Sequence, residues 1–165
     1  MNPLATEPIA THRPTHGFGI SRRDLLAVGG PVFLGGLIYL LFRPSTVVFF
    51  RWLEPLQLGG LFGVARTVAE PINPLIPGFM VYSLPALLWT FSFTYAVGRL
   101  WAGDSWCIRA IMLALVLAVS VLFEIGQALG WVSGIFDMND LLATLAGFLL
   151  SIVLNHWRDR HDVRT

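Results

Sequence analysis

Four long apolar stretches constrain the fold of this chain more than any other feature. They lie near residues 24–42, 81–100, 108–129 and 140–155. A helix of roughly 20 apolar residues, rising about 1.5 Å per residue, crosses the roughly 30 Å hydrocarbon core of a bilayer. Only 13% of the residues are charged, whereas a soluble domain has about 25%. The sequence therefore predicts an all-α integral membrane protein, built as a bundle of four spanning helices.

The segment between the first two stretches, residues 43–81, is no uninterrupted span, because it carries five charged residues and five prolines. Within it, Leu56–Ala69 has an amphipathic pattern, which predicts a helix that lies on the membrane surface or folds over the bundle. Pro71–Pro77 is predicted to form a rigid linker. The alternative is a re-entrant hairpin, whose backbone would have to be covered by protein.

Local features of the first apolar stretch predict how its helix begins and packs. Asp24 is expected in the first turn, where the helix dipole favours an acid. Pro31 lies inside the stretch and predicts a kink. Four glycines give the helix a thin face that another helix could approach closely; these are Gly29, Gly30, Gly35 and Gly36.

The distribution of arginines predicts the orientation in the membrane. Residues 1–20 are expected to be a flexible tail, residues 21–157 the transmembrane domain, and residues 158–165 a second tail. With the amino terminus inside, the cytoplasmic side holds eight arginines and the other side three. The eight are Arg13, Arg22, Arg23, Arg99, Arg109, Arg158, Arg160 and Arg164, and the three are Arg43, Arg51 and Arg66. Because cytoplasmic loops carry the excess of basic residues, both termini are expected in the cytoplasm. The expected location of the protein is a bacterial inner membrane.

A group of polar residues lies between the third and fourth stretches and is the candidate ligand-binding site. We call it the carboxylate seam, and it consists of Glu124, Gln127, Phe136, Asp137 and Asp140. Glu124 and Gln127 are three residues apart and project from one helix face. Asp137 is placed to cap the fourth helix, with Asp140 in its first turn, and capping alone would account for both aspartates.

Capping does not account for Glu124, which follows a run of apolar residues near the end of its span. A carboxylate at membrane depth is expected to be neutral, paired or facing water. A buried ion pair with Arg43, Arg51 or Arg66 is one explanation. The other is a polar pocket that opens toward the outer leaflet and is lined by the seam, with Trp89 and Trp131 as further aromatic candidates.

The seam resembles a motif of VanZ-like membrane proteins, in the form Phe123-Glu124-x-x-Gln127 followed by Phe136-Asp137-x-x-Asp140. A second motif of some members is similar to Leu84–Ser92. The resemblance covers residues 80–150 and implies a small multi-span protein. The namesake of the family is linked to low-level resistance to teicoplanin, and no reaction is established for the family. Gly147 matches the pattern, whereas Gly134 and Thr144 stand where many members carry Arg and Asn.

Four classes of function remain open, the last of them a purely structural or assembly role. In the first, the seam binds an envelope-related lipid, a lipid-linked glycan intermediate or a partner protein, including a second copy of the chain. In the second, Glu124 with Asp137 or Asp140 supplies the acid and base of a hydrolase or transferase at the membrane surface. In the third, Glu124 couples proton movement to transport. A metal bridged by the three carboxylates is chemically reasonable, but we expect neither a metal nor a cofactor.

The net charge of +1 gives no reason to expect nucleic-acid binding, so the bilayer is the first expected partner. Cys107 is the only cysteine, which excludes an intramolecular disulfide.

Overall fold

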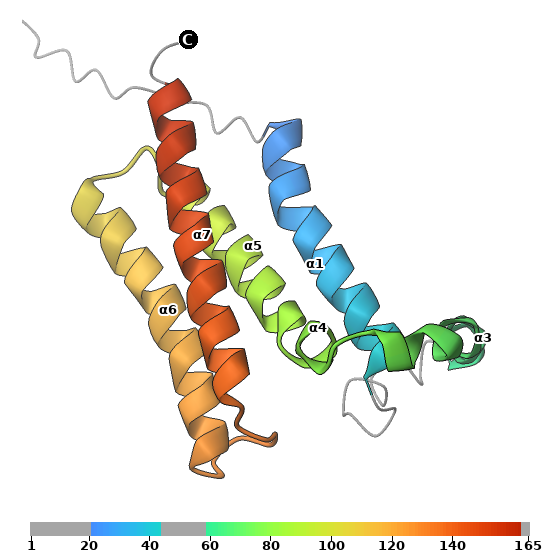
Figure 1. Ribbon diagram of the computed structural model, residues 1–165. Coiled ribbons are helices and arrows are strands. Elements are labelled where there is room, and N and C mark those ends of the chain that lie inside the picture. The colour runs from blue at the N-terminus through green and yellow to red at the C-terminus, as the bar shows by residue number, and fades with distance from the viewer. Residues whose placement is uncertain (1–20, 44–58, 163–165) are drawn as a thin grey trace, which may run out of the picture.

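The computed structural model describes residues 21–43 and 59–162, and its described residues form helices and connections without a strand (Figure 1). The long helices are α1 (Arg22–Phe42), α5 (Leu84–Leu100), α6 (Trp106–Ala128) and α7 (Met138–Asp162). Between α1 and α5 lie α3 (Gly59–Ala69), the 3-10 helix η2 (Glu70–Leu75) and α4 (Gly78–Tyr82). The prediction of an all-α protein is confirmed for this part of the chain.

Three of the described helices, α1, α6 and α7, are long and apolar enough to cross a membrane. This supports an integral membrane protein, as predicted. Helix α5 has 17 residues, which gives it a length of about 26 Å at 1.5 Å per residue. That length falls short of a hydrocarbon core of roughly 30 Å, so the span predicted over residues 81–100, the second of the four, is not confirmed.

The helix ends follow from local capping and from proline. Ser21 and Asp24 form a capping box at the start of α1: each side chain accepts a hydrogen bond from the other residue's backbone N–H. Pro85 occupies the first turn of α5 and separates it from α4 at Ser83. Pro31 lies inside α1, and the helix continues through it.

Helix α7 continues beyond the predicted end of the fourth stretch at residue 155 and reaches Asp162. The segment from residue 158 is therefore not a separate tail within the described residues. The physical reason lies in Arg158 and Asp159, which form ion pairs with neighbouring helices. These pairs compensate the charges, so the helix need not end where the apolar sequence ends.

Helix α5 is the centre of the bundle, because it packs against α1, α6 and α7. Figure 1 shows α1 and α6 on opposite sides of the pair formed by α5 and α7. The face of α7 toward α5 repeats small or polar buried residues every fourth position, at Ala143, Gly147, Ser151 and Asn155. A Cβ atom on Gly147 would collide with the Leu87 carbonyl oxygen and lie 3.1 Å from the Phe91 nitrogen. The two backbones therefore approach closely, as small residues permit in membrane bundles.

The contact between α1 and α5 uses one of the four glycines that were expected to form a thin face. A Cβ atom on Gly35 would lie 2.6 Å from Nε1 of Trp89, and that nitrogen lies 3.4 Å from the Val32 carbonyl oxygen, to which it donates. Gly29, Gly30 and Gly36 have open space around them within the described structure. Trp89 thus packs between α1 and α5.

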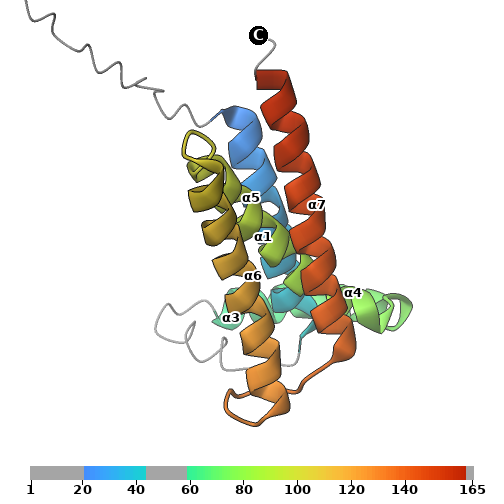
Figure 2. The ribbon, with the colours of Figure 1, turned by 90° about the vertical axis from the view of Figure 1, so that its left-hand side faces the viewer.

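Helices α3 and α4 lie across one end of the four long helices (Figures 1 and 2). Leu61, Val64 and Val68 form an exposed apolar stripe along α3. The described part of the predicted amphipathic segment is therefore a crosswise helix at the end of the bundle, and residues 56–58 lie outside the described residues. The predicted linker Pro71–Pro77 is helical over much of its length, as part of η2, and it ends at Pro77, the N-cap of α4.

We predict that Gly147→Leu lowers the stability of the folded protein, because the new side chain meets backbone atoms of α5 that cannot rotate away. Overpacking of this kind costs about 1–3 kcal/mol. Thermal unfolding of the purified protein in detergent measures the change. Gly30→Leu, which adds the same side chain to open space on α1, is the matched control. Equal melting temperatures for the two variants would contradict the close contact.

Candidate functional site

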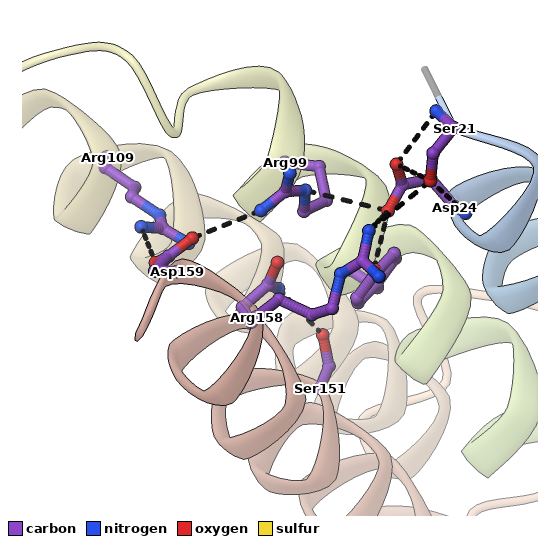
Figure 3. A network of polar contacts seen from close by, with 9 residues as sticks. Ser21, Asp24, Arg99, Arg109, Ser151, Arg158 and Asp159 are labelled. Carbon is purple, nitrogen blue, oxygen red and sulfur yellow. Dashed lines mark hydrogen bonds and ion pairs between the residues drawn. The ribbon is translucent and has the colours of Figure 1, made fainter. Parts of the chain in front are cut away.

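Two polar clusters lie at opposite ends of the long helices. The carboxylate seam lies where α6 ends and α7 begins. The second cluster, which we call the end network, lies where α1 begins and α5 and α7 end. It comprises Ser21, Asp24, Tyr95, Arg99, Arg109, Arg158 and Asp159 (Figure 3).

The seam is built by the end of α6 and the loop that follows. Gly130 has a φ of 71°, which a residue without a side chain adopts readily. The amide of Gly130 donates to the Gln127 carbonyl at 3.1 Å, and the amide of Trp131 donates to the Gly126 carbonyl at 2.8 Å. This pair of bonds is a Schellman motif. It ends α6 and turns the chain back toward the start of α7.

Asp137 caps α7, as the sequence predicted. Its Oδ1 accepts hydrogen bonds from the backbone nitrogen of Asn139 at 2.9 Å and from Nδ2 of the same residue at 3.0 Å. The Asp137 carbonyl accepts the amides of Asp140 and Leu141. Asp140 lies in the first turn of α7, also as predicted. Asp137 is therefore held by capping, and Asp140 is the aspartate whose side chain remains available.

Glu124 is the most enclosed residue of the seam, with 8% of its surface exposed. Its Oε2 is buried without a hydrogen-bond partner among the described residues, and the same is true of Oδ1 of Asp140. Asp140 and Asp137 lie close enough to Glu124 for their charges to act on it. The structure thus brings together the three carboxylates that the sequence singled out, with two buried oxygens that lack a donor.

Gln127 and Phe136 complete the seam as partly buried residues. The Gln127 side chain packs on Gly134, where a Cβ atom would lie 2.7 Å from the Gln127 Cδ. Gly134 also has a φ of 150°, so a side chain there would be strained as well as crowded. Phe136 lies in the loop directly before Asp137, whereas Trp131 is exposed. The loop therefore lies against the end of α6 at Gln127.

The arginines proposed as counter-ions of Glu124 lie elsewhere in the described structure. Arg43 donates to the Tyr82 carbonyl at 2.8 Å and stacks on the Tyr39 and Tyr82 rings. Arg66 donates to the Leu40 carbonyl at 2.8 Å. Both therefore hold the segment between α1 and α5 against α1, through α4 and α3, and the predicted buried pair with Glu124 is wrong for these two. Arg51 lies outside the described residues.

The end network compensates its buried charges, in contrast to the seam. Asp24 has 6% of its surface exposed. Its Oδ1 accepts from the Tyr95 hydroxyl at 2.7 Å and from Arg158 at 3.3 Å. Arg99 approaches the same oxygen at 3.7 Å. Asp24 is thus more than the first-turn acid that the sequence predicted, because it joins α1 to α5 and α7.

A second carboxylate, Asp159, extends the network to α6. Arg99 lies 3.2 Å from its Oδ1, and Arg109 lies 2.5 Å from its Oδ2. The sequence analysis placed Arg99, Arg109 and Arg158 on one side of the membrane without assigning partners. Asp24 and Asp159 are expected on the same side of the membrane as these arginines, and pairing the acids with the arginines would have predicted this network.

The described residues contain no group of three His, Cys, Asp or Glu side chains that could hold a metal ion. A metal bridged by Glu124, Asp137 and Asp140, which the sequence left open, therefore has no support from the geometry. The structure also describes a cavity of about 260 Å³ between the end of α1, α3 and η2, with Arg43, Arg66 and Glu70 in its lining.

We predict opposite effects on stability for the two clusters. Asp24→Asn leaves Arg99 and Arg158 without their shared carboxylate, and loss of one partner of a buried pair costs about 3–5 kcal/mol. Glu124→Gln replaces a buried carboxyl group that has no counter-ion among the described residues, so the free energy of unfolding should stay equal or rise. Thermal unfolding of both variants in the same detergent measures the difference. A large loss of stability in Glu124→Gln would identify Glu124 as a structural residue.

Comparison of the chain with protein-family models, curated proteins and solved structures gave no match. The similarity to VanZ-like proteins therefore rests on the motif residues alone. The function has to be inferred from the residues of the seam and their geometry.

Proposed function

We propose that this protein is a multi-pass, VanZ-like protein of the bacterial inner membrane whose carboxylate seam binds an envelope-related ligand. The ligand class comprises a lipid, a lipid-linked glycan intermediate or a partner protein. One observation carries the proposal: Glu124 is buried with an unpartnered oxygen, and two further carboxylates lie close to it. A buried ionisable group without a partner in a membrane protein points to a functional site.

The alternative of acid–base catalysis receives less support from the same geometry. A hydrolase would use Glu124 with Asp137 or Asp140, and both members of such a pair must reach the substrate. Asp137 is held by two hydrogen bonds from Asn139, which leaves Asp140 as the second carboxylate. Proton coupling would also use Glu124, and the loss of a pH-dependent activity in Glu124→Gln would favour it over binding.

In the proposed arrangement α5 is the fourth span, and α4 extends it by a short helix at the same end as the seam. Its packing against α1, α6 and α7 places it among helices that are long enough to cross the bilayer. The crosswise α3 would then lie at the membrane surface, with its apolar stripe toward the lipid. A re-entrant hairpin would run into the bundle along the long helices, and the crosswise position of α3 does not support this alternative.

The arginines of the described residues support an orientation. Arg22, Arg23, Arg99, Arg109, Arg158 and Arg160 lie at the end of the bundle that carries the end network, and Arg43 and Arg66 lie at the other. The excess of basic residues marks the cytoplasmic side. The seam would therefore face the exterior, which is the periplasm in a Gram-negative cell, at the level of the outer headgroups.

Cysteine labelling tests this orientation. Cys107 is the only cysteine, and it is exposed in the first turn of α6, at the end proposed to be cytoplasmic. A membrane-impermeant maleimide should label it in inverted vesicles and leave it unlabelled in spheroplasts. In a Cys107→Ser, Ser133→Cys double variant, the exposed residue 133 of the seam loop should give the reverse pattern. Labelling of Cys107 from outside would reverse the proposed topology.

Co-purification tests the binding function. Glu124→Gln and Asp140→Asn should fold with unchanged yield and lose a lipid or lipid-linked species that the parent protein retains, as measured by mass spectrometry of the purified samples. Asp137→Asn keeps the cap, because Asn caps helices as well as Asp does, and it should have a smaller effect. Asp104→Asn, which changes an exposed acid at the opposite end, is the matched control. Identical bound species in all four variants would contradict the proposal.

A further inference from the structure

The seam contains hydrogen-bond acceptors that need donors. Within the part of the chain that the structure describes, Oε2 of Glu124 and Oδ1 of Asp140 are both buried without a hydrogen-bond partner. An ionised carboxylate is an acceptor only, and a buried acceptor without a donor carries the full cost of its desolvation. Asp137 adds a third acidic group, although its Oδ1 already accepts two hydrogen bonds from Asn139. A ligand that satisfies the seam therefore brings donors.

The ligand also brings positive charge. Among the described basic residues, none forms an ion pair with Glu124, Asp137 or Asp140. At the opposite end of the bundle the acids are paired. Asp24 and Asp159 form ion pairs with Arg99, Arg109 and Arg158. At the seam this compensation is missing from the described structure. An electropositive donor group is the chemical complement of the site.

The arrangement of the two unpartnered oxygens favours an organic cation with a compact head. The described acids are not grouped so as to hold a metal ion. The two oxygens belong to side chains on different helices, α6 and α7. A planar guanidinium matches the two oxygens of one carboxylate, whereas an ammonium is a point charge with three donors in different directions. The seam therefore suits a primary ammonium better than a guanidinium.

The position of the seam matches the depth of a lipid headgroup. Glu124 lies in the last turns of α6 and Asp140 in the first turn of α7, and both helices are long and apolar enough to cross a membrane. Gln127, Asp137 and Asp140 are only partly buried, so the seam is accessible from outside the protein. A group that reaches Glu124 would come from the headgroup layer or from the aqueous side.

We infer that the carboxylate seam binds a primary ammonium group, of the kind that an aminophospholipid headgroup carries, between Glu124 and Asp140. The inference rests on the proposed function and names the chemistry of its ligand. Phosphatidylethanolamine offers three N–H donors at the headgroup, and phosphatidylcholine carries the same charge without a donor. The two lipids therefore separate donor recognition from charge alone.

Native mass spectrometry of the full-length protein in mixed micelles tests the inference. The micelles contain equimolar phosphatidylethanolamine and phosphatidylcholine with identical acyl chains. The parent protein and Asp104→Asn should retain the ethanolamine lipid about tenfold over the choline lipid, the scale of one hydrogen bond to a charged group. Glu124→Gln and Asp140→Asn should lose this preference. Equal retention of both lipids by the parent, or an unchanged preference in both variants, would overturn the inference.

Soluble ethanolamine distinguishes the two sources of the ammonium group. If it displaces the retained lipid from the parent protein, the seam recognises the amine by itself; if only the intact lipid binds, the acyl chains contribute as well. Both results support ammonium recognition. If instead the parent shows no preference but Glu124→Gln loses another lipid-linked species, the inference fails and the proposed binding function stands.

Discussion

The close approach of α5 and α7 is the contact on which the rest of this structure depends. It is possible because Gly147 and Gly98 have no side chains: one packs on the backbone of α5 and the other on the Asn155 side chain of α7. Helix α5 in turn packs against α1 through the contact of Trp89 with Gly35. Because α7 begins at the seam and ends in the end network, the same helix pair fixes the positions of both polar clusters.

The two clusters show two uses of buried charge in one chain. In the end network, Asp24 and Asp159 hold four helices together because each acid is shared by two arginines. At the seam, three acids from α6 and α7 lie near one another without a described counter-ion. Asp24 is compensated by two arginines and joins helices, whereas Glu124 has no counter-ion among the described residues, and this difference is the basis for proposing Glu124 as a site.

Much of the fold could be predicted from hydropathy, because an apolar stretch of about 20 residues predicts a helix of about the same limits. The end of α7 could not, because Arg158 and Asp159 belong in a helix only when α5 and α6 supply their partners. For the seam, the spacing of Glu124, Asp137 and Asp140 predicted their proximity, and the cap at Asp137 followed from its place before an apolar helix. The sequence could not predict that Arg43 leaves Glu124 without a pair. Tertiary packing decides that Arg43 bonds the Tyr82 carbonyl and not Glu124.

The short length of α5 has a consequence for the lipid around the proposed bundle. A lone helix of about 26 Å would draw the bilayer thinner around itself, at a cost that grows with each ångström of hydrophobic mismatch. Helix α5 stands instead among α1, α6 and α7, and its buried residues include Thr90, Ser92 and Thr94. The middle of α5 is therefore covered largely by protein on this polar face. In the proposed bundle, the preferred membrane thickness is therefore set by α1, α6 and α7, and not by α5, the shortest of the four long helices.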